Sequence, residues 1–267
     1  MQRDENRFKH WMQAKDTPPP LGSSIMSASP IVAEAMGHVG FDWLLVDMEH
    51  SPIDIAQATS ILQALSGTPS EVVLRVPWND PVMVKRVMDA GARSIMFPFV
   101  ESVAEARAAV AATRYPPRGT RGVAAMHRAS RFGTAPDYLA CANDQVAVIV
   151  QLETPQAAAL LPQIAEIDGV DAVFIGPGDL SGGMGLLGQI GHADVQSALA
   201  DAAQAARDAG LACGIVGADP ASVRSYMAMG FSYVAIASDL GLLMGAAKSA
   251  AAAVRGTDAQ PSAGGVY

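Results

Sequence analysis

The sequence predicts a (β/α)₈ barrel, because short apolar segments alternate with helical segments eight times along 267 residues. One barrel of this type has about 250 residues, so the length fits a single copy. The apolar segments are rich in β-branched residues, which is typical of parallel strands buried on both faces. We therefore expect one barrel domain over residues 1–255, including a short amino-terminal helix, and a disordered tail over residues 256–267.

An amphipathic pattern predicts the amino-terminal helix over Asn6–Asp16, and the prolines at 18–20 end it. The eight predicted strands are Leu21–Met26, Trp43–Met48, Val72–Val76, Ser94–Phe99, Ala147–Val150, Ala172–Phe174, Ala212–Val216 and Tyr233–Ala237. The eight predicted helices are Pro30–His38, Pro52–Leu65, Pro81–Ala90, Ser102–Thr113, Thr154–Ile164, Val195–Ala209, Pro220–Met229 and Leu240–Val254. One helix follows each strand, as a barrel of parallel strands requires.

Local signals mark many of the predicted helix ends. A capping side chain precedes proline at Ser51-Pro52, Asp80-Pro81, Thr154-Pro155 and Asp219-Pro220. Proline at the first helical position removes an N–H that has no intrahelical partner, so the pair is well suited to start a helix. Glycine follows four of the helices, at Gly40, Gly91, Gly210 and Gly230, where a left-handed residue can end a helix.

Composition excludes several classes of partner. The net charge of −8 and the absence of a basic run argue against a nucleic acid or an anionic membrane. No apolar run is long enough for a membrane span, and the first residues are too polar for a signal peptide. The two cysteines, Cys141 and Cys213, fit small core residues in a reducing compartment. We therefore expect a cytoplasmic protein.

Two carboxylates follow neighbouring predicted strands, Glu153 after the fifth and Asp179 after the sixth. The carboxyl ends of barrel strands lie at one face, where catalytic groups gather. Two hard oxygen ligands suit Mg²⁺ or Mn²⁺, with water and substrate completing the shell. Alternatively, Glu153 caps the helix that opens at Pro155 and Asp179 closes a turn.

Other polar residues are predicted at the same face. The second strand carries Asp47 near its end and is followed by Glu49 and His50, and Arg75 lies within the apolar third strand. A buried guanidinium needs a partner. Arg75 therefore either forms a salt bridge to Asp47 or Glu49, or stabilises an oxyanion that develops during catalysis.

His50 has two possible roles. It is either an exposed residue at a helix start or a proton carrier oriented by a carboxylate, with Asp47 and Asp89 as candidates. The segment Gly176-Pro177-Gly178 predicts a tight turn whose N–H groups can hold a small carboxylate. Lysines occur only at 9, 15, 85 and 248, outside the predicted strands, which excludes a Schiff-base mechanism.

Several of these segments together resemble the metal-dependent class II pyruvate aldolases. They are residues 41–52, 75–80, 114–123, 151–154 and 174–181, and the similarity extends from Leu21 to Val254. The most similar types are the 4-hydroxy-2-oxoheptanedioate aldolases and the 2-keto-3-deoxy sugar acid aldolases. The resemblance implies a barrel of the phosphoenolpyruvate/pyruvate type. It also implies a homohexamer, a trimer of dimers in which the last helix is exchanged between subunits.

The resemblance also implies roles for individual residues. Glu153 and Asp179 would hold a divalent metal ion (Mg²⁺, Mn²⁺ or Co²⁺), and Gln151, Gly178 and Asp179 would contact the keto acid. Arg75 would stabilise the enolate, and His50 would handle the proton of the C4 hydroxyl. Asp89 matches a residue that raises the basicity of this histidine, so we rank Asp89 above Asp47.

One position departs from the family. Members often have tryptophan on the first strand where this chain has Ser24, which predicts a wider pocket for larger substrates. Val216, at the end of the seventh strand, is expected to shape the same pocket. The arginines at 118, 121, 128 and 131 either bind a carboxylate of the acceptor or form salt bridges between subunits.

The expected function is that of a carbon–carbon lyase. A metal-dependent aldolase would reversibly cleave 4-hydroxy-2-oxo acids to an aldehyde and pyruvate, or a close analogue such as hydroxypyruvate. Its partners would be the small keto acid and aldehyde, within the catabolism of aromatic compounds or sugar acids. The alternatives are a lyase that acts on a CoA thioester in a related barrel and a barrel that binds without catalysis.

Overall fold

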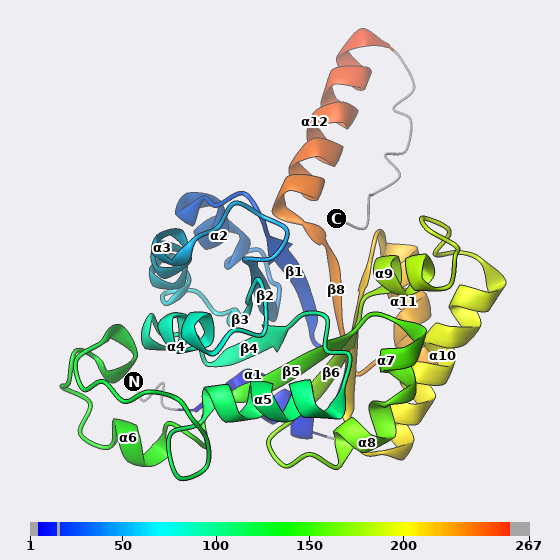
Figure 1. The fold of residues 1–267 in the computed structure, drawn as a ribbon. Helices are drawn as coiled ribbons and strands as arrows, with labels where there is room; N and C mark the ends of the chain where they lie inside the picture. The colour runs from blue at the N-terminus through cyan, green and yellow to red at the C-terminus, as the bar shows by residue number, and fades with distance from the viewer. Residues whose placement is uncertain (1–4, 15–16, 257–267) are drawn as a thin grey trace.

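The computed structural model describes residues 5–14 and 17–256 and contains a closed barrel of eight parallel strands, neighbouring in sequence order (Figure 1). The strands are β1 Leu21–Ile25, β2 Trp43–Asp47, β3 Glu71–Arg75, β4 Ser94–Phe97, β5 Ala147–Leu152, β6 Ala172–Ile175, β7 Ala212–Gly217 and β8 Tyr233–Ser238. The predicted barrel is therefore confirmed, and every predicted strand is present within one or two residues of its predicted start and end.

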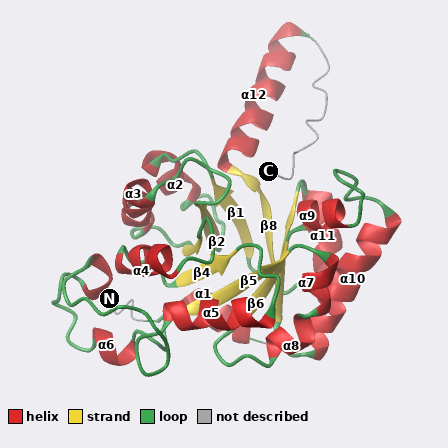
Figure 2. Cartoon of the chain, in the orientation of Figure 1, coloured by secondary structure: helices red, strands yellow, loops and turns green. Residues whose placement is uncertain are grey.

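Helices surround the barrel (Figure 2). The α-helices are α1 Arg7–Gln13, α2 Pro30–Met36, α3 Ile55–Leu65, α4 Pro81–Asp89, α5 Val103–Thr113, α6 Tyr138–Cys141, α7 Pro155–Ala159, α8 Leu161–Ala165, α9 Pro177–Gly183, α10 Ala193–Asp208, α11 Pro220–Met229 and α12 Asp239–Arg255. A 3₁₀ turn, η1, covers Arg128–Ser130. The sequence did not predict α6, α9 or η1, and Cys141, expected in the core, lies exposed in α6.

The predicted helix start at Ser51-Pro52 is wrong. Helix α3 begins at Ile55, because Asp54 and Gln57 form a complete capping box around its first turn. The Ser51 hydroxyl instead donates a hydrogen bond to the carbonyl of Asp47. Residues 50–54 therefore remain a loop at the end of β2, and this loop carries His50. The proline starts at Pro81, Pro155 and Pro220 are confirmed.

Two further predictions fail near β5 and β6, both at prolines. The helix expected over Thr154–Ile164 is divided into α7 and α8, because Pro162 has no N–H for the helical hydrogen bond. The tight turn expected at Gly176-Pro177-Gly178 is instead the start of α9, with Pro177 as its first residue. Gly178 and Asp179 consequently lie in the first turn of a helix.

The interior of the barrel is filled by layers of side chains from alternate strands, as in other (β/α)₈ barrels. The strand registers place Ser24, Arg75, Gln151 and Val216 together in the layer nearest the carboxyl ends. Leu45, Met96, Phe174 and Ala235 form the next layer, and these side chains belong to one apolar cluster. The interior therefore changes from apolar to polar within one layer.

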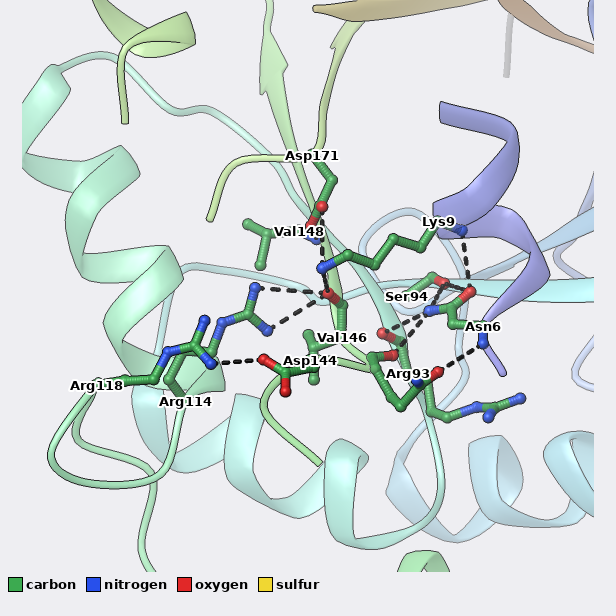
Figure 3. A network of polar contacts seen from close by, with 11 residues as sticks. Asn6, Lys9, Arg93, Ser94, Arg114, Arg118, Asp144, Val146, Val148 and Asp171 are labelled. Atoms are coloured by element: carbon green, nitrogen blue, oxygen red, sulfur yellow. Dashed lines mark hydrogen bonds and ion pairs between the residues drawn. The ribbon is translucent and has the colours of Figure 1, made fainter. Parts of the chain in front are cut away.

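Helix α1 closes the opposite, amino-terminal end of the barrel. Phe8 is fully buried, and its ring lies edge-on to Trp43 and Tyr233 at centroid distances of 5.6 and 5.7 Å. Asn6, the N-cap of α1, donates to the carbonyls of Arg93 and Gln145 and to the hydroxyl of Ser94 (Figure 3). Helix α1 thus seals this end by the apolar packing of Phe8 and the hydrogen bonds of Asn6.

Helix α12 projects away from the barrel in continuation of β8 (Figure 1). Apart from Asp239, its residues are exposed or half-buried, and Leu243, Met244 and Val254 are 52–90% exposed. None of the helices in the described part of the chain has the length and apolar character needed to cross a membrane. The tail predicted to be disordered lies, beyond Gly256, outside the described residues.

Candidate active site

Arg75 is the centre of the polar layer at the carboxyl ends of the strands. Its Nε and Nη2 donate to the two carboxylate oxygens of Asp47 at 3.0 and 2.8 Å, and Nη1 lies 3.0 Å from Oε2 of Glu49. The guanidinium is completely buried. The register of β2 and β3, which pairs Asp47 with Arg75, aligns the first pair. Arg75 therefore forms both salt bridges that the sequence suggested, one to each acid.

A second chain of contacts extends from Arg75 to Glu153. Arg75 Nη1 donates to Oε1 of Gln151 at 3.4 Å, and Gln151 Nε2 donates to Oε1 of Glu153 at 2.5 Å. The backbone N–H of Phe99 donates to the other Glu153 oxygen at 3.0 Å. The hydroxyl of Thr154 caps α7. Glu153 is therefore not the helix cap that the alternative interpretation required, and its carboxylate is held inside the site.

The acids at this end of the barrel repel one another. Burial, opposed by Arg75 and reinforced by Asp47 and Asp179, raises the pKa of Glu49 to about 7. Burial also raises the pKa of Glu153 to about 7, with the Phe99 N–H opposing and Glu49 and Asp179 reinforcing the shift. Glu49 and Glu153 are thus close enough to each other and to Asp179 for these charges to raise the pKa values of the two glutamates. The site favours an additional positive charge.

The donor set at this position suits a hard divalent cation. Glu153 is buried at the end of β5, and Asp179 stands exposed in the first turn of α9, beyond the neighbouring strand β6. Within the described residues no group of three or more acidic, histidine or cysteine side chains forms a ready metal cage. Two carboxylates would leave most positions of an octahedral shell to water and substrate oxygens, which is common for Mg²⁺. These two acids therefore fit a metal ion that also binds a substrate.

His50 lies on the loop after β2, with its side chain 45% exposed. Its Nε2 is 3.7 Å from Oε2 of Glu49, and its backbone N–H donates to Asp47 at 3.4 Å. Asp47 thus holds the backbone of His50, while both of its oxygens bind Arg75. From the sequence, Glu49 is placed among the acids of this face without a role, although its carboxylate lies 3.7 Å from the His50 ring.

Asp89 is not beside His50 within one chain. It ends α4, at the amino-terminal end of the barrel, where it binds Arg121 at 2.7 Å and lies 3.7 Å from His127. The other arginines of this region also have partners in the same chain. Arg118 binds Asp144, and Arg128 donates to the carbonyls of Ala90 and Leu62. These groups stabilise the end opposite the site.

Ser24 and Val216 lie in the same interior layer as Arg75 and Gln151, as their strand positions predicted. They are 1% and 6% exposed. Gly178, the remaining predicted contact, is half-buried at the start of α9. One chain therefore brings together all the predicted site residues except Asp89.

Comparison with known proteins gives one consistent result. Residues 24–246 match the family model described as HpcH/HpaI aldolase/citrate lyase. The chain is 48% identical to the 2-dehydro-3,6-dideoxy-6-sulfogluconate aldolase of Pseudomonas putida, over 93% of this chain and 97% of that protein. It is 44% identical to the 4-hydroxy-2-oxo-heptane-1,7-dioate aldolase of Shigella sonnei, over 98% of this chain and all of that protein.

A solved structure agrees with these matches. The crystal structure of an HpcH/HpaI aldolase/citrate lyase family protein from Burkholderia cenocepacia J2315 superimposes with a TM-score of 0.90 at 42% identity. The superposition includes 94% of this chain and 99% of the Burkholderia chain. These matches confirm the predicted family and the prediction of a carbon–carbon lyase of the aldolase type. The relatives are aldolases, and the similarity to each extends over nearly the whole chain. The chain belongs to the HpcH/HpaI aldolase/citrate lyase family.

Proposed function

We propose that the protein is a divalent-metal-dependent aldolase that reversibly cleaves 4-hydroxy-2-oxo acids to an aldehyde and pyruvate, or a close analogue such as hydroxypyruvate. The observation that carries this proposal is the contact chain Asp47–Arg75–Gln151–Glu153, with Glu49 and Asp179 beside it. In this chain the guanidinium of Arg75 is a fixed positive charge, and the neighbouring carboxylates of Glu49 and Glu153 favour the binding of a second cation. The names of the two relatives, each an aldolase of a 2-oxo acid, support the same substrate class.

Glu153 and Asp179 would hold the metal ion, which we expect to be Mg²⁺, Mn²⁺ or Co²⁺. When bound, such an ion supplies a Lewis acid that polarises the keto oxygen of the substrate. Gln151, Gly178 and Asp179 would contact the keto acid, and Ser24 and Val216 would line its pocket. Gln151 is well placed for this role because Arg75 and Glu153 fix its amide on both sides.

The cleavage would use His50 and Arg75. His50 accepts the proton of the C4 hydroxyl while the C3–C4 bond breaks, which releases the aldehyde and leaves the electron pair on the enolate of the keto acid. Arg75 stabilises the negative enolate oxygen, and C3 then takes up a proton to give pyruvate. Arg75 is held by two carboxylates, so it is preorganised before the charge develops.

The role predicted for Asp89 requires a second subunit. Asp89 and His50 lie at opposite ends of one barrel, and both oxygens of Asp47 are occupied by Arg75. We therefore place Asp89 of a partner subunit beside His50, within a homohexamer. The projecting α12, with exposed Leu243, Met244 and Val254, supports the exchange of this helix between subunits.

The test is a coupled assay of pyruvate release from several 4-hydroxy-2-oxo acids. Treatment with EDTA is expected to abolish release, and Mg²⁺, Mn²⁺ or Co²⁺ to restore it. Glu153→Gln is expected to lose both the restoration and the binding of Mn²⁺ measured by calorimetry. Glu101→Gln is the matched control, because Glu101 is an exposed acid that accepts from the neighbouring Thr154. Release that persists in EDTA, or cleavage of CoA thioesters alone, would refute the proposal.

A further inference from the structure

The hydroxyl of Ser24 takes part in no step of the proposed reaction, although Ser24 would line the substrate pocket. Ser24 is 1% exposed, and among the described residues no group hydrogen-bonds to its Oγ. A buried hydroxyl without a partner costs about 1–3 kcal/mol, so proteins seldom retain one without a ligand or water to pair it. The adjacent Ser23 differs, because its hydroxyl donates to the carbonyl of Ile236 at 2.9 Å.

The backbone beside Ser24 is also irregular. The pairing of β1 with β8 shifts register between Gly22 and Ser24, so that β8 contains a bulge. Ala237, within the bulge, has a φ of 49°, in the left-handed region that residues other than glycine rarely adopt. Bulges next to active sites redirect side chains, and backbone strain is concentrated at functional sites. The strained bulge is therefore a second, independent observation at this position.

The depth of Ser24 indicates which part of a substrate it faces. It lies in the same layer as Arg75 and Gln151, at the floor of the site, and β1 is across the barrel from β5, which carries Gln151 and Glu153. In the proposed reaction the keto acid turns its oxygens toward those groups. The aldehyde enters from the open face above. In that orientation C3 of the keto acid would be the carbon on the side of Ser24.

We propose that Ser24 selects keto acids with a hydroxyl on C3, so that hydroxypyruvate is the preferred nucleophile and 3,4-dihydroxy-2-oxo acids are the preferred substrates for cleavage. This inference rests on the proposed function. The C3 hydroxyl would pair the Ser24 hydroxyl, whereas the methyl group of pyruvate would leave it unpaired. The names of the two relatives describe substrates without oxygen on C3, so the proposed preference would distinguish this chain from those two proteins.

The test is a competition between hydroxypyruvate and pyruvate for one acceptor, propanal, in the presence of Mn²⁺. The ratio of the two aldol products gives the ratio of kcat/KM values directly. Ser24→Ala is expected to shift this ratio toward pyruvate by about threefold to tenfold, the effect of one hydrogen bond. Ser24→Cys, which keeps a short unbranched side chain but donates only weakly, is expected to shift it in the same direction.

Ser23→Ala is the matched control, because it removes a hydroxyl on the same strand that is already paired. It is expected to leave the product ratio unchanged. An unchanged ratio in both Ser24 variants, with wild-type activity toward pyruvate intact, would overturn the role of Ser24 and leave the proposed function standing. A wild-type protein that forms neither product would overturn both.

Discussion

The two ends of the barrel differ in how their polar groups are paired. At the amino-terminal end, Asn6 makes three side-chain donor contacts, and Lys9 binds Asp171 at 3.1 Å and the carbonyl of Val146 at 2.8 Å (Figure 3). At the carboxyl-terminal end, Glu49 and Glu153 have raised pKa values, and the hydroxyl of Ser24 has no hydrogen-bond partner in the described part of the chain. The polar groups around α1 pair with one another, whereas the carboxyl-terminal end retains groups that a ligand can satisfy.

Arg75 and Arg114 make this comparison testable, since both are buried arginines, one at each end. Arg75→Lys keeps the charge but loses the bidentate contact with Asp47. We expect kcat to fall by about 10²-fold or more, with a much smaller change in KM, because the lost donor acts on a charge that develops in the transition state. Steady-state kinetics of pyruvate release measure both constants.

Arg114→Lys is the matched control at the other end, where both terminal nitrogens of Arg114 donate to the carbonyl of Val146. It is expected to lower the melting temperature and leave kcat unchanged. Equal activity of Arg75→Lys and the wild type would contradict the role of Arg75.

A substitution at Phe8 tests whether packing at the amino-terminal end serves stability alone. Phe8→Ala removes a fully buried ring from the contacts with Trp43 and Tyr233, which is expected to cost about 3–5 kcal/mol of unfolding free energy. Urea denaturation measures this loss. The kcat of the folded fraction should not change, because the apolar layers separate Phe8 from Arg75. Leu187→Ala, at a side chain that is 81% exposed, is the control and should be nearly neutral. A large fall in kcat for Phe8→Ala would show that the two ends are coupled.

The smallest expected effect concerns pH. The pKa values of Glu49 and Glu153 are raised in the folded state from 4.5 to about 7, so the folded protein retains protons that the unfolded chain has lost. Their contribution to stability is thus complete below pH 4.5 and is lost as the pH rises to 7 and beyond. In EDTA, we expect a lower melting temperature at pH 8 than at pH 5. The difference should be about 2–4 °C for each kcal/mol of unfolding free energy that is lost.

A divalent ion should reverse this loss, because it binds the ionised carboxylates. Mn²⁺ is therefore expected to raise the melting temperature more at pH 8 than at pH 5. Glu153→Gln should reduce both the pH dependence in EDTA and the response to Mn²⁺. A response to Mn²⁺ that is equal at the two pH values would argue against these carboxylates as the binding groups.

Local patterns in the sequence determined the barrel and the face that carries the site. Apolar β-branched segments define the strands, proline and capping residues define three helix starts, and Glu153, Asp179, Arg75 and His50 were assigned to the carboxyl ends of strands. These signals act within a few residues of the chain, so one sequence contains them completely. The same reasoning failed where two local signals compete, as at Ser51-Pro52 and the capping box of Asp54 and Gln57.

Only the tertiary structure decided the pairing of groups that are distant in sequence. The register of β2 and β3 gives Arg75 both Asp47 and Glu49, the bulge in β8 adjoins the unpaired hydroxyl of Ser24, and the direction of α4 carries Asp89 to the opposite end from His50. Strand registers and helix directions follow from packing the whole barrel at once. Which charges meet is therefore a property of the closed fold, whereas which residues reach each end can be predicted from the sequence.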